Sequence, residues 1–325
     1  MTKFLNNINF WYKNARPYSV PITFLSWLCA YTYSLTQGGN FIYGLIALVG
    51  ISLVHLSTNL ADDYFDYKRL TKDEKYLKSV KDIKCKYLKT GQATIDDLRN
   101  VIIILLFISS IAGGILFLTS GWYVFLFAVI ALIIALSYSA LSSRGFGDAA
   151  VILAYGPLMF EGVYYVMTSN LSLDILILSL GCAMIVNTIL YAHMLMDYDE
   201  DVISGKTTLC TKLKTKNNAL NFLLLFYFTG YIILACMAVK TENYFYLLPI
   251  ITAIFVNDLY KKMQTYPQKD INIIFIKYPF INANSLLANK NAPFLLRFIY
   301  TRNIAVYFML LVCLAIICGL VCKQM

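Results

Sequence analysis

Residues 101–141 read VIIILLFISSIAGGILFLTSGWYVFLFAVIALIIALSYSAL and contain no Asp, Glu, Lys or Arg. A helix needs roughly 20 apolar residues to cross a bilayer, so this stretch is long enough to cross twice. The pair Ser120-Gly121 interrupts it near its midpoint and leaves room only for a tight turn. Because hydrocarbon offers no hydrogen-bond partners to the backbone, both halves must be helical. The stretch therefore predicts a helical hairpin inside a membrane.

The rest of the chain has the same character. Of its 325 residues, 59% are hydrophobic and only 14% are charged, and the mean hydropathy is +0.65. A soluble domain carries about 25% charged residues. The apolar runs predict a single all-α membrane domain over 1–325 with about nine transmembrane helices. The expected spans are residues 19–37, 41–60, 101–119, 122–141, 149–168, 173–196, 220–239, 243–259 and 303–322.

The basic residues indicate how the chain is oriented. The net charge is +9, and Lys and Arg gather in alternate loops, whereas the loops between them are nearly free of positive charge. Cytoplasmic loops of membrane proteins carry the excess of Lys and Arg. We therefore expect the N-terminus in the cytoplasm and the C-terminus outside. The loops expected to line a cytoplasmic site are residues 62–100, 197–219 and 260–302. The lipid bilayer is the expected partner, and nothing indicates nucleic-acid binding or an obligate protein partner.

Two acidic clusters follow two of the expected spans. Residues 55–66 read HLSTNLADDYFD, and residues 193–209 read HMLMDYDEDVISGKTTL. Each stretch contains His-x₃-(Asn/Asp)-x₃-Asp, which sets three side chains on one face of a helix. The aligned residues are His55, Asn59, Asp63, His193, Asp197 and Asp201. Both clusters end spans on the side expected to face the cytoplasm.

This pattern predicts a magnesium site. Like charges four positions apart on a helix repel each other, so two such clusters are costly unless a cation lies between them. Mg²⁺ prefers oxygen ligands, typically one or two carboxylates completed by substrate phosphates. We expect Asp63 and Asp66 to hold one ion, and Asp197 and Asp201 a second, with both bridging to a diphosphate. The alternative is that the acidic residues only mark helix ends that reach water.

Both clusters resemble the motifs of the UbiA-type intramembrane aromatic prenyltransferases. Residues 59–66 are similar to N-x-x-N-D-Y-F-D, and residues 197–209 match D-x-D-x-D-x-x-x-G-K-x-T-L without a gap. Between them, residues 144–148 (RGFGD), 155–158 (YGPL) and 162–168 (GVYYVMT) resemble segments of the 1,4-dihydroxy-2-naphthoate polyprenyltransferase branch, which serves menaquinone biosynthesis. The resemblance covers about 55–210.

The resemblance implies nine helices around a central cavity and Mg²⁺-dependent transfer of a polyprenyl group from its diphosphate to an aromatic acceptor. In the naphthoate branch the prenyl group replaces the ring carboxylate, with loss of CO₂. That branch often has Asn at the positions where this chain has Asp62, His193 and Met194. The residues expected to bind the substrates are Asn59, Tyr64, Lys68, Arg69, Tyr138, Arg144 and Lys206. Lys86 and Lys89 are further candidates to contact the diphosphate.

Three acidic residues are candidates for catalysis. Asp199 and Asp62 are positioned to take up a proton, and Glu161 lies in the fifth span, where an ionisable side chain is expensive and functional by default. The alternative for Glu161 is a pairing with a neighbouring helix. Asn187 in the sixth span is expected to link helices by a hydrogen bond.

Two other functions remain open. One is a UbiA-type enzyme with another acceptor, such as 4-hydroxybenzoate or a haem precursor. The other is a membrane cation transporter, although transport carboxylates usually lie near the bilayer midplane and these lie at one face. In each case we expect an integral, multi-pass protein of a bacterial cytoplasmic membrane, with the site facing the cytoplasm.

Overall fold

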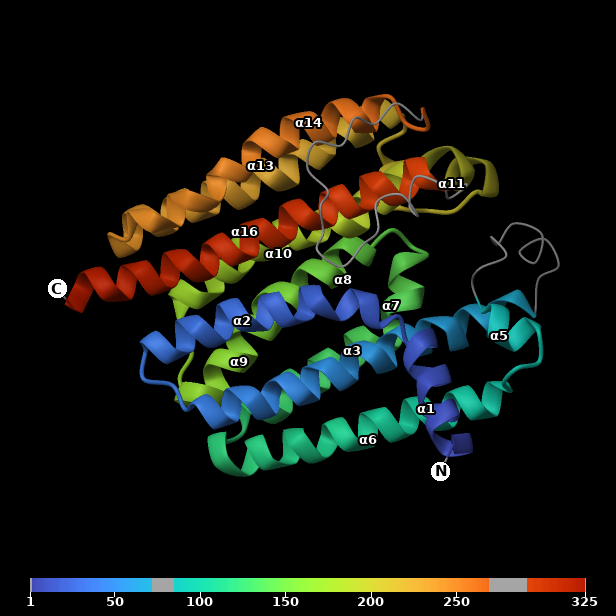
Figure 1. Ribbon diagram of the computed structural model, residues 1–325, viewed down its shortest axis with the longest axis horizontal. Coiled ribbons are helices and arrows are strands. Elements are labelled where there is room, and N and C mark those ends of the chain that lie inside the picture. The colour runs from blue at the N-terminus through green and yellow to red at the C-terminus, as the bar shows by residue number, and fades with distance from the viewer. Residues whose placement is uncertain (1, 72–84, 269–290, 325) are drawn as a thin grey trace.

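The computed structural model describes residues 2–71, 85–268 and 291–324. Its long helices lie side by side in one elongated bundle (Figure 1). In chain order the helices and helical turns are α1 (Thr2–Asn14), η1 (Pro17–Ser19), α2 (Val20–Thr36), α3 (Phe41–Leu70), α5 (Lys86–Lys89), α6 (Ile95–Ser120), α7 (Tyr123–Ser142), α8 (Gly147–Leu153), η2 (Ala154–Leu158), α9 (Met159–Thr168), α10 (Leu173–Met196), α11 (Tyr198–Ser204), α12 (Leu209–Lys212), α13 (Lys216–Thr241), η3 (Tyr244–Thr252), α14 (Ala253–Gln264) and α16 (Ala292–Gln324). The expected all-α class is confirmed for the described residues.

Within the described residues, seven helical segments are long and apolar enough to cross a membrane, which supports an integral, multi-pass protein. The other two expected spans, 19–37 and 243–259, coincide with the 17-residue α2 and with η3 followed by α14. The count of nine crossings stays a prediction. Residues 101–141 form the expected hairpin, as α6 and α7 joined at Gly121 and Trp122.

The sixth expected span, α10, is the centre of the bundle. In α10, 67% of the apolar stretch is buried inside the protein, against 17% in α6 and 11% in α7. α10 packs against α13, α16 and α8, whereas α3 packs against α6, α7 and α2. α2 contacts both α9 and α16 and so connects the two groups of helices. The hairpin that first revealed the membrane character therefore lies at the periphery, where lipid replaces protein as the solvent.

The start of α6 matches its sequence signal. Thr94 Oγ1 accepts from the backbone N–H of Asp97 at 3.1 Å, and Asp97 Oδ2 accepts from the backbone N–H of Thr94 at 2.9 Å. These reciprocal bonds form a capping box, which satisfies N–H groups that the first turn of a helix leaves unpaired. Residues 94–97 (TIDD) have capping-box spacing in the sequence, which predicts a helix start at Thr94, and the structure confirms it.

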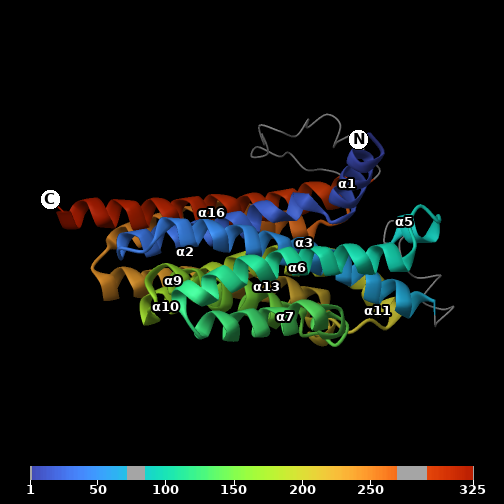
Figure 2. The same ribbon diagram turned by 90° about the horizontal axis from the view of Figure 1, so that it is seen from below.

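The expected cytoplasmic loops are shorter than the sequence indicated. α3 continues to Leu70 and α6 begins at Ile95, while α14 ends at Gln264 and α16 begins at Ala292. The middles of both loops, 72–84 and 269–290, lie outside the described residues. We call the end of the bundle where α3 and α10 finish the acidic end. Figure 1 and Figure 2 both show α5 and α11 at this end of the bundle, with α1 on one side of the bundle near it.

The fifth expected span is broken at its middle. α8 and α9 are separated by η2, in which Gly156 has non-helical angles (φ −105°, ψ −110°) and Pro157 lacks the N–H that a helix would use. Gly156 also packs closely on α10, since a Cβ built there would lie 2.7 Å from Ala183 Cβ and 3.1 Å from Ser179 O. The break therefore depends on the absence of a side chain at Gly156.

Replacing Gly156 by Ala tests this close approach. We expect Gly156→Ala to lower the free energy of unfolding by about 1–3 kcal/mol, the usual cost of overpacking a filled interior. The measurement is the thermal midpoint of purified protein in detergent. Gly162→Ala is the matched control, because a Cβ there meets its nearest neighbour, Phe127 Cγ, only at 4.0 Å. Equal midpoints for the two variants would contradict the proposed contact.

Candidate active site

The first acidic cluster lies on α3 as it reaches the acidic end. Asp63 and Asp66 are buried, with 3% and 6% of their surface exposed, and Asp62 is half-buried. Ser139 Oγ, from α7, donates to Asp66 Oδ1 at 3.2 Å. Taking a carboxylate out of water is costly unless polar or charged groups compensate. The groups that face these carboxylates therefore decide whether the cluster can exist.

Among the described residues, Arg16 is a cation that faces this cluster, a role that no local sequence pattern indicates. Its Nη1 lies 3.5 Å from Asp62 Oδ2, and its Nη2 forms an ion pair with Asp63 Oδ1. Burial opposes the charged guanidinium, but the two carboxylates outweigh this effect and raise the pKa of Arg16. Arg16 has a left-handed backbone (φ 56°) directly before Pro17, at the entry to the first span. That position is the one sequence signal that separates it from the other basic residues.

Two further side chains support the first cluster. The Tyr87 hydroxyl donates to Asp63 Oδ2 at 3.1 Å. Burial and the charge of Asp63 raise the pKa of Tyr87, so the phenol stays a donor. Asn59 Nδ2 donates to Ala15 O at 2.9 Å and to Ser19 Oγ at 3.1 Å. Asn59 thus joins α3 to the segment that carries Arg16 into α2.

The second acidic cluster lies where α10 ends and α11 begins. Asp197 is the residue between these helices, so the single helix expected through Asp201 is two helices. The backbone N–H of Asp201 still donates to Asp197 O at 2.8 Å, and His193 Nδ1 lies 3.2 Å from Asp197 Oδ2. The four-residue spacing is therefore kept across the break.

The carboxylates of the second cluster differ in burial. Asp201 is 6% exposed, and Lys206 Nζ lies 3.3 Å from its Oδ1. Burial raises the pKa of Asp201; Lys206 opposes this effect and Asp197 adds to it. Asp199 has 68% of its side chain exposed and pairs with Lys216 Nζ at 2.6 Å. Asp201 therefore belongs to the interior of the acidic end, and Asp199 to its surface.

The turn between α7 and α8 connects the two clusters. The Arg144 backbone pairs with Thr207 in an isolated parallel bridge, and Lys212 Nζ donates to Arg144 O at 3.0 Å. Ser139, near the end of α7, contacts Asp66 of the first cluster. Residues 139–144 therefore contact α3 through Ser139 and contact Thr207, which follows the second cluster, through Arg144. Lys212, one of the basic residues that follow the sixth expected span, therefore has a specific partner here.

The remaining basic and aromatic candidates stay close to the first cluster. Lys68 Nζ lies 4.5 Å from the centroid of the Tyr64 ring on the same helix. The side chain of Arg69 lies outside the described residues. Tyr138 is half-buried on α7, next to Ser139. Their sequence positions on α3 and α7 keep Tyr64, Lys68 and Tyr138 at the acidic end.

Glu161 is not brought to the acidic clusters. It is 8% exposed, and its Oε2 accepts from the backbone N–H of Ser172 at 3.4 Å. Ser172 directly precedes α10, whose 24 residues span about 36 Å at the helical rise, and Asp197 follows the opposite end. The structure therefore favours the alternative in which Glu161 pairs with a neighbouring helix.

The acidic residues suit a hard divalent cation by their chemistry. Asp63, Asp66 and Asp201 are buried carboxylates, and Mg²⁺ prefers oxygen ligands. Arg16 and Lys206 neutralise part of their charge. Within residues 2–71, 85–268 and 291–324, no group of three or more His, Cys, Asp or Glu side chains lies close enough to hold a metal ion. The donors therefore fit Mg²⁺ as two separate groups of oxygen atoms.

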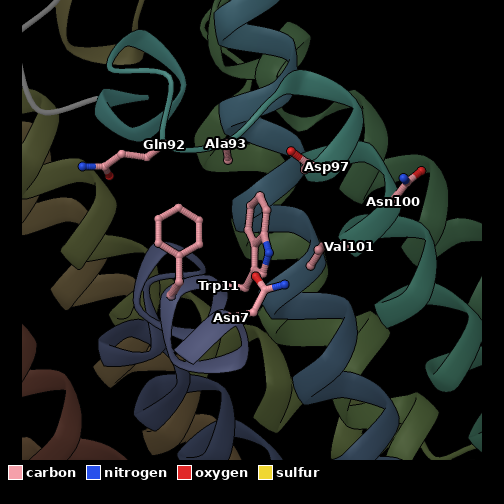
Figure 3. A pocket seen from close by; sticks show the side chains of 8 residues that line it. Asn7, Trp11, Gln92, Ala93, Asp97, Asn100 and Val101 are labelled. Atoms are coloured by element: carbon pink, nitrogen blue, oxygen red, sulfur yellow. The ribbon is translucent and has the colours of Figure 1, made fainter. Parts of the chain in front are cut away.

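A cavity of about 430 Å³ lies beside the first cluster, between α1 and the start of α6 (Figure 3). Its lining residues are Asn7, Phe10, Trp11, Gln92, Ala93, Asp97, Asn100 and Val101. The lining has a carboxylate and no Lys or Arg, so it does not suit an anionic diphosphate. Phe10 and Trp11 pack edge-on against the Tyr87 ring, each at 5.9 Å between centroids. The cavity therefore lies next to Tyr87, which donates a hydrogen bond to Asp63, and the carboxylates of the first cluster do not line it.

These features define a polytopic helical membrane protein with two acidic clusters at one end of its bundle. The model of the UbiA prenyltransferase family matches residues 19–284, and the chain belongs to this family. The resemblance inferred from the two acidic motifs is therefore confirmed, and the chain is a prenyltransferase enzyme.

Individual relatives agree with this assignment. The chain is 24% identical over 221 residues to a 1,4-dihydroxy-2-naphthoate octaprenyltransferase of Haemophilus influenzae, a match that covers 63% of this chain and 70% of that protein. It is 22% identical over 220 residues to the protein of the same name from Escherichia coli, covering 64% and 69%.

Solved structures share the fold. A structure described as a digeranylgeranylglyceryl phosphate synthase aligns with a TM-score of 0.63 at 15% identity, covering 97% of this chain and 99% of that one. A UbiA homologue from Archaeoglobus fulgidus, bound to DMAPP and Mg²⁺, aligns with a TM-score of 0.57 at 17% identity, covering 91% and 99%. At these identities the likeness concerns the arrangement of helices.

Removing the Arg16 side-chain charge tests its role at the first cluster. We expect Arg16→Gln to destabilise the protein by roughly 1–3 kcal/mol, because the buried Asp63 loses this ion pair. The thermal midpoint in detergent, without substrates, is the measurement. Arg99→Gln is the control, since Arg99 and Asp96 form an exposed pair at 3.2 Å that contributes little. A midpoint unchanged in Arg16→Gln would contradict the assigned pairing.

Proposed function

We propose that this prenyltransferase moves a polyprenyl group from its diphosphate to an aromatic acceptor, 1,4-dihydroxy-2-naphthoate, in menaquinone biosynthesis. The observation that carries the proposal is that two carboxylate clusters, from α3 and from the end of α10, lie at the same end of the bundle (Figure 1). The names of the two bacterial relatives support the acceptor, and they match the branch that the central sequence segments favoured. The acidic end faces the cytoplasm in this proposal, because described lysines such as Lys86, Lys89 and Lys206 lie there.

The acidic residues are assigned to Mg²⁺. Asp63 and Asp66 would hold one ion and Asp197 and Asp201 another, with Asn59 assisting from α3. When bound, Mg²⁺ supplies positive charge that makes the diphosphate a better leaving group. The solved UbiA homologue with DMAPP and Mg²⁺ supports a divalent ion in a site of this type.

The basic residues are assigned to the diphosphate. Lys206 lies beside Asp201, Arg144 lies on the turn between the clusters, and Arg16 lies beside Asp63. Lys68 and Arg69 are the candidates from the end of α3. Each of these cations would hold a phosphate oxygen as the bond between the prenyl carbon and the diphosphate oxygen breaks, and the electron pair leaves with the diphosphate.

The prenyl carbon then bonds to the electron-rich ring of the acceptor. With 1,4-dihydroxy-2-naphthoate the new bond replaces the ring carboxylate, which leaves as CO₂ and returns its electron pair to the ring. The Tyr64 and Tyr138 rings are the candidates to face the positively charged allylic group, and Asp199 or Asp62 would take up a proton. Glu161 is left out of this scheme because it lies near the end of the bundle opposite Asp197.

Neutralising one carboxylate in each cluster tests the metal assignment. We expect Asp66→Asn and Asp197→Asn each to lower prenyl transfer by about 100-fold or more, since each removes a ligand charge and keeps the side-chain shape. The assay follows transfer from a radiolabelled polyprenyl diphosphate by purified, membrane-inserted protein. Asp174→Asn should retain activity, because Asp174 lies in the first turn of α10, at the end opposite Asp197, and pairs with Lys240. Full activity in both cluster variants would refute the roles assigned here.

Withdrawing divalent ions tests the cofactor. We expect EDTA to abolish transfer and added Mg²⁺ to restore it, because the carboxylates alone would repel the diphosphate. Activity that persists in EDTA-treated protein would contradict the magnesium requirement.

The acceptor is tested with a panel of aromatic acids that includes 1,4-dihydroxy-2-naphthoate, 4-hydroxybenzoate and a haem precursor. We expect a prenylated, decarboxylated product from the naphthoate alone, identified by mass spectrometry. Transfer only to another acceptor would keep the donor chemistry and overturn the menaquinone assignment.

A further inference from the structure

Asp148 and Asn187 form a buried polar pair that the proposed reaction does not use. Asp148, at the start of α8, is 4% exposed, and Asn187, in α10, is 0% exposed. Asn187 Nδ2 donates to Asp148 Oδ1 at 2.9 Å. The expectation that Asn187 links helices by a hydrogen bond is therefore confirmed, and its partner is the acidic residue of the central motif at 144–148.

This pair leaves buried polar atoms without hydrogen bonds, which is unfavourable for stability. Asp148 Oδ2 and Asn187 Oδ1 are buried and have no hydrogen-bond partner within the part of the chain that the structure describes. A buried acceptor without a donor costs about 1–3 kcal/mol. Apolar residues of similar volume often replace buried charged or polar groups with no loss of stability, or with a gain. A pair that keeps two unsatisfied oxygen atoms therefore needs a reason other than stability.

The position of the pair supplies a reason. Asp148 directly follows the turn that joins the two acidic clusters, and Asn187 lies on the helix that ends at Asp197. On its other side the turn is held by Lys212, which bonds Arg144 O at 3.0 Å and lies 4.5 Å from the Phe146 ring centroid.

The turn itself cannot move without losing this contact. Gly145 has φ +76°, and a Cβ there would lie 2.8 Å from Lys212 Cε. Lys212 therefore packs directly on the backbone of Gly145. The lysine holds one side of the turn, and the hydrogen bond between Asp148 and Asn187 holds the other.

We propose that Asp148 and Asn187 are positioning residues that fix the turn of residues 144–147 between the two acidic clusters and so place Arg144 for the diphosphate of the prenyl donor. The identity of that ligand rests on the proposed function. The hydrogen bond connects the turn to α10 and thereby sets Arg144 relative to the second cluster. Its loss would leave the carboxylates in place and displace only the cation between them.

The sharpest test removes the pair without leaving a hole or a charge. In Asp148→Leu/Asn187→Leu we expect a thermal midpoint equal to or above that of the wild type, because no unsatisfied oxygen remains. We expect the KM for a polyprenyl diphosphate to rise about tenfold while kcat stays within about twofold, since donor binding is lost and not chemistry. Tryptic cleavage after Arg144, measured without substrates, should become at least about fivefold faster as the turn loosens.

Two controls separate positioning from a general structural effect. Thr188→Val removes the neighbouring buried bond from Thr188 Oγ1 to Tyr227 OH, 3.2 Å, which joins α10 to α13. It should lower the thermal midpoint and leave both KM and cleavage unchanged. The swap Asp148→Asn/Asn187→Asp restores an amide–carboxylate bond and should return both readouts to within about twofold of wild type. The swap also carries the test if the double leucine variant does not insert.

The outcomes are distinct. Unchanged KM and cleavage in the double leucine variant, or equal changes in Thr188→Val, would overturn the proposal. A swap that inserts and shows the defects of a broken pair would overturn it as well. Absence of prenyl transfer in the wild type would refute the proposed function instead, while the cleavage rates would still report whether the pair holds the turn.

Discussion

The acidic end depends on carboxylates that are buried where membrane helices reach water. Asp63, Asp66 and Asp201 are each less than a tenth exposed, and such groups are tolerated only if other polar groups face them. Arg16, Ser139 and Lys206 supply those groups from three other parts of the chain. The need to compensate buried negative charge therefore brings the N-terminal segment, α7 and the segment after α11 together at one end of the bundle.

The same compensation prepares the site for its proposed substrates. The carboxylates favour a divalent metal ion, and the Arg and Lys side chains beside them favour phosphate groups. The apolar helices beyond the acidic end provide a surface against which an isoprenoid chain can bury its hydrocarbon. The turn at 144–147 lies between the two sets of charges, so its placement matters more than its exposed position suggests. Contacts from Lys212 on one side and Asn187, through Asp148, on the other hold it.

The two acidic groups of the candidate site could be predicted from local spacing in the sequence, whereas the partners of their side chains could not. Residues four apart on a helix share a face whatever the rest of the fold does, so the two acidic groups could be recognised in the sequence. The capping box at Thr94 is equally local. Arg16 could not be assigned, because its partners lie far along the chain and one Arg near a membrane entry resembles any other. The partner of Glu161 could not be assigned either, because burial predicts that an ionisable group needs a partner and does not say which one.

Local sequence patterns were enough to predict a helical chain, its place in a membrane and the acidic groups that end two of its spans. These properties follow from apolar runs, helix periodicity and charge placement, which act over a few turns of helix. The packing of the helices places both acidic groups at the same end of the bundle and breaks the fifth expected span at Gly156, against α10. It also pairs Arg16 with Asp63 and Lys206 with Asp201. Those outcomes depend on close packing and on ion pairs between segments far apart in the chain, and no local pattern encodes them.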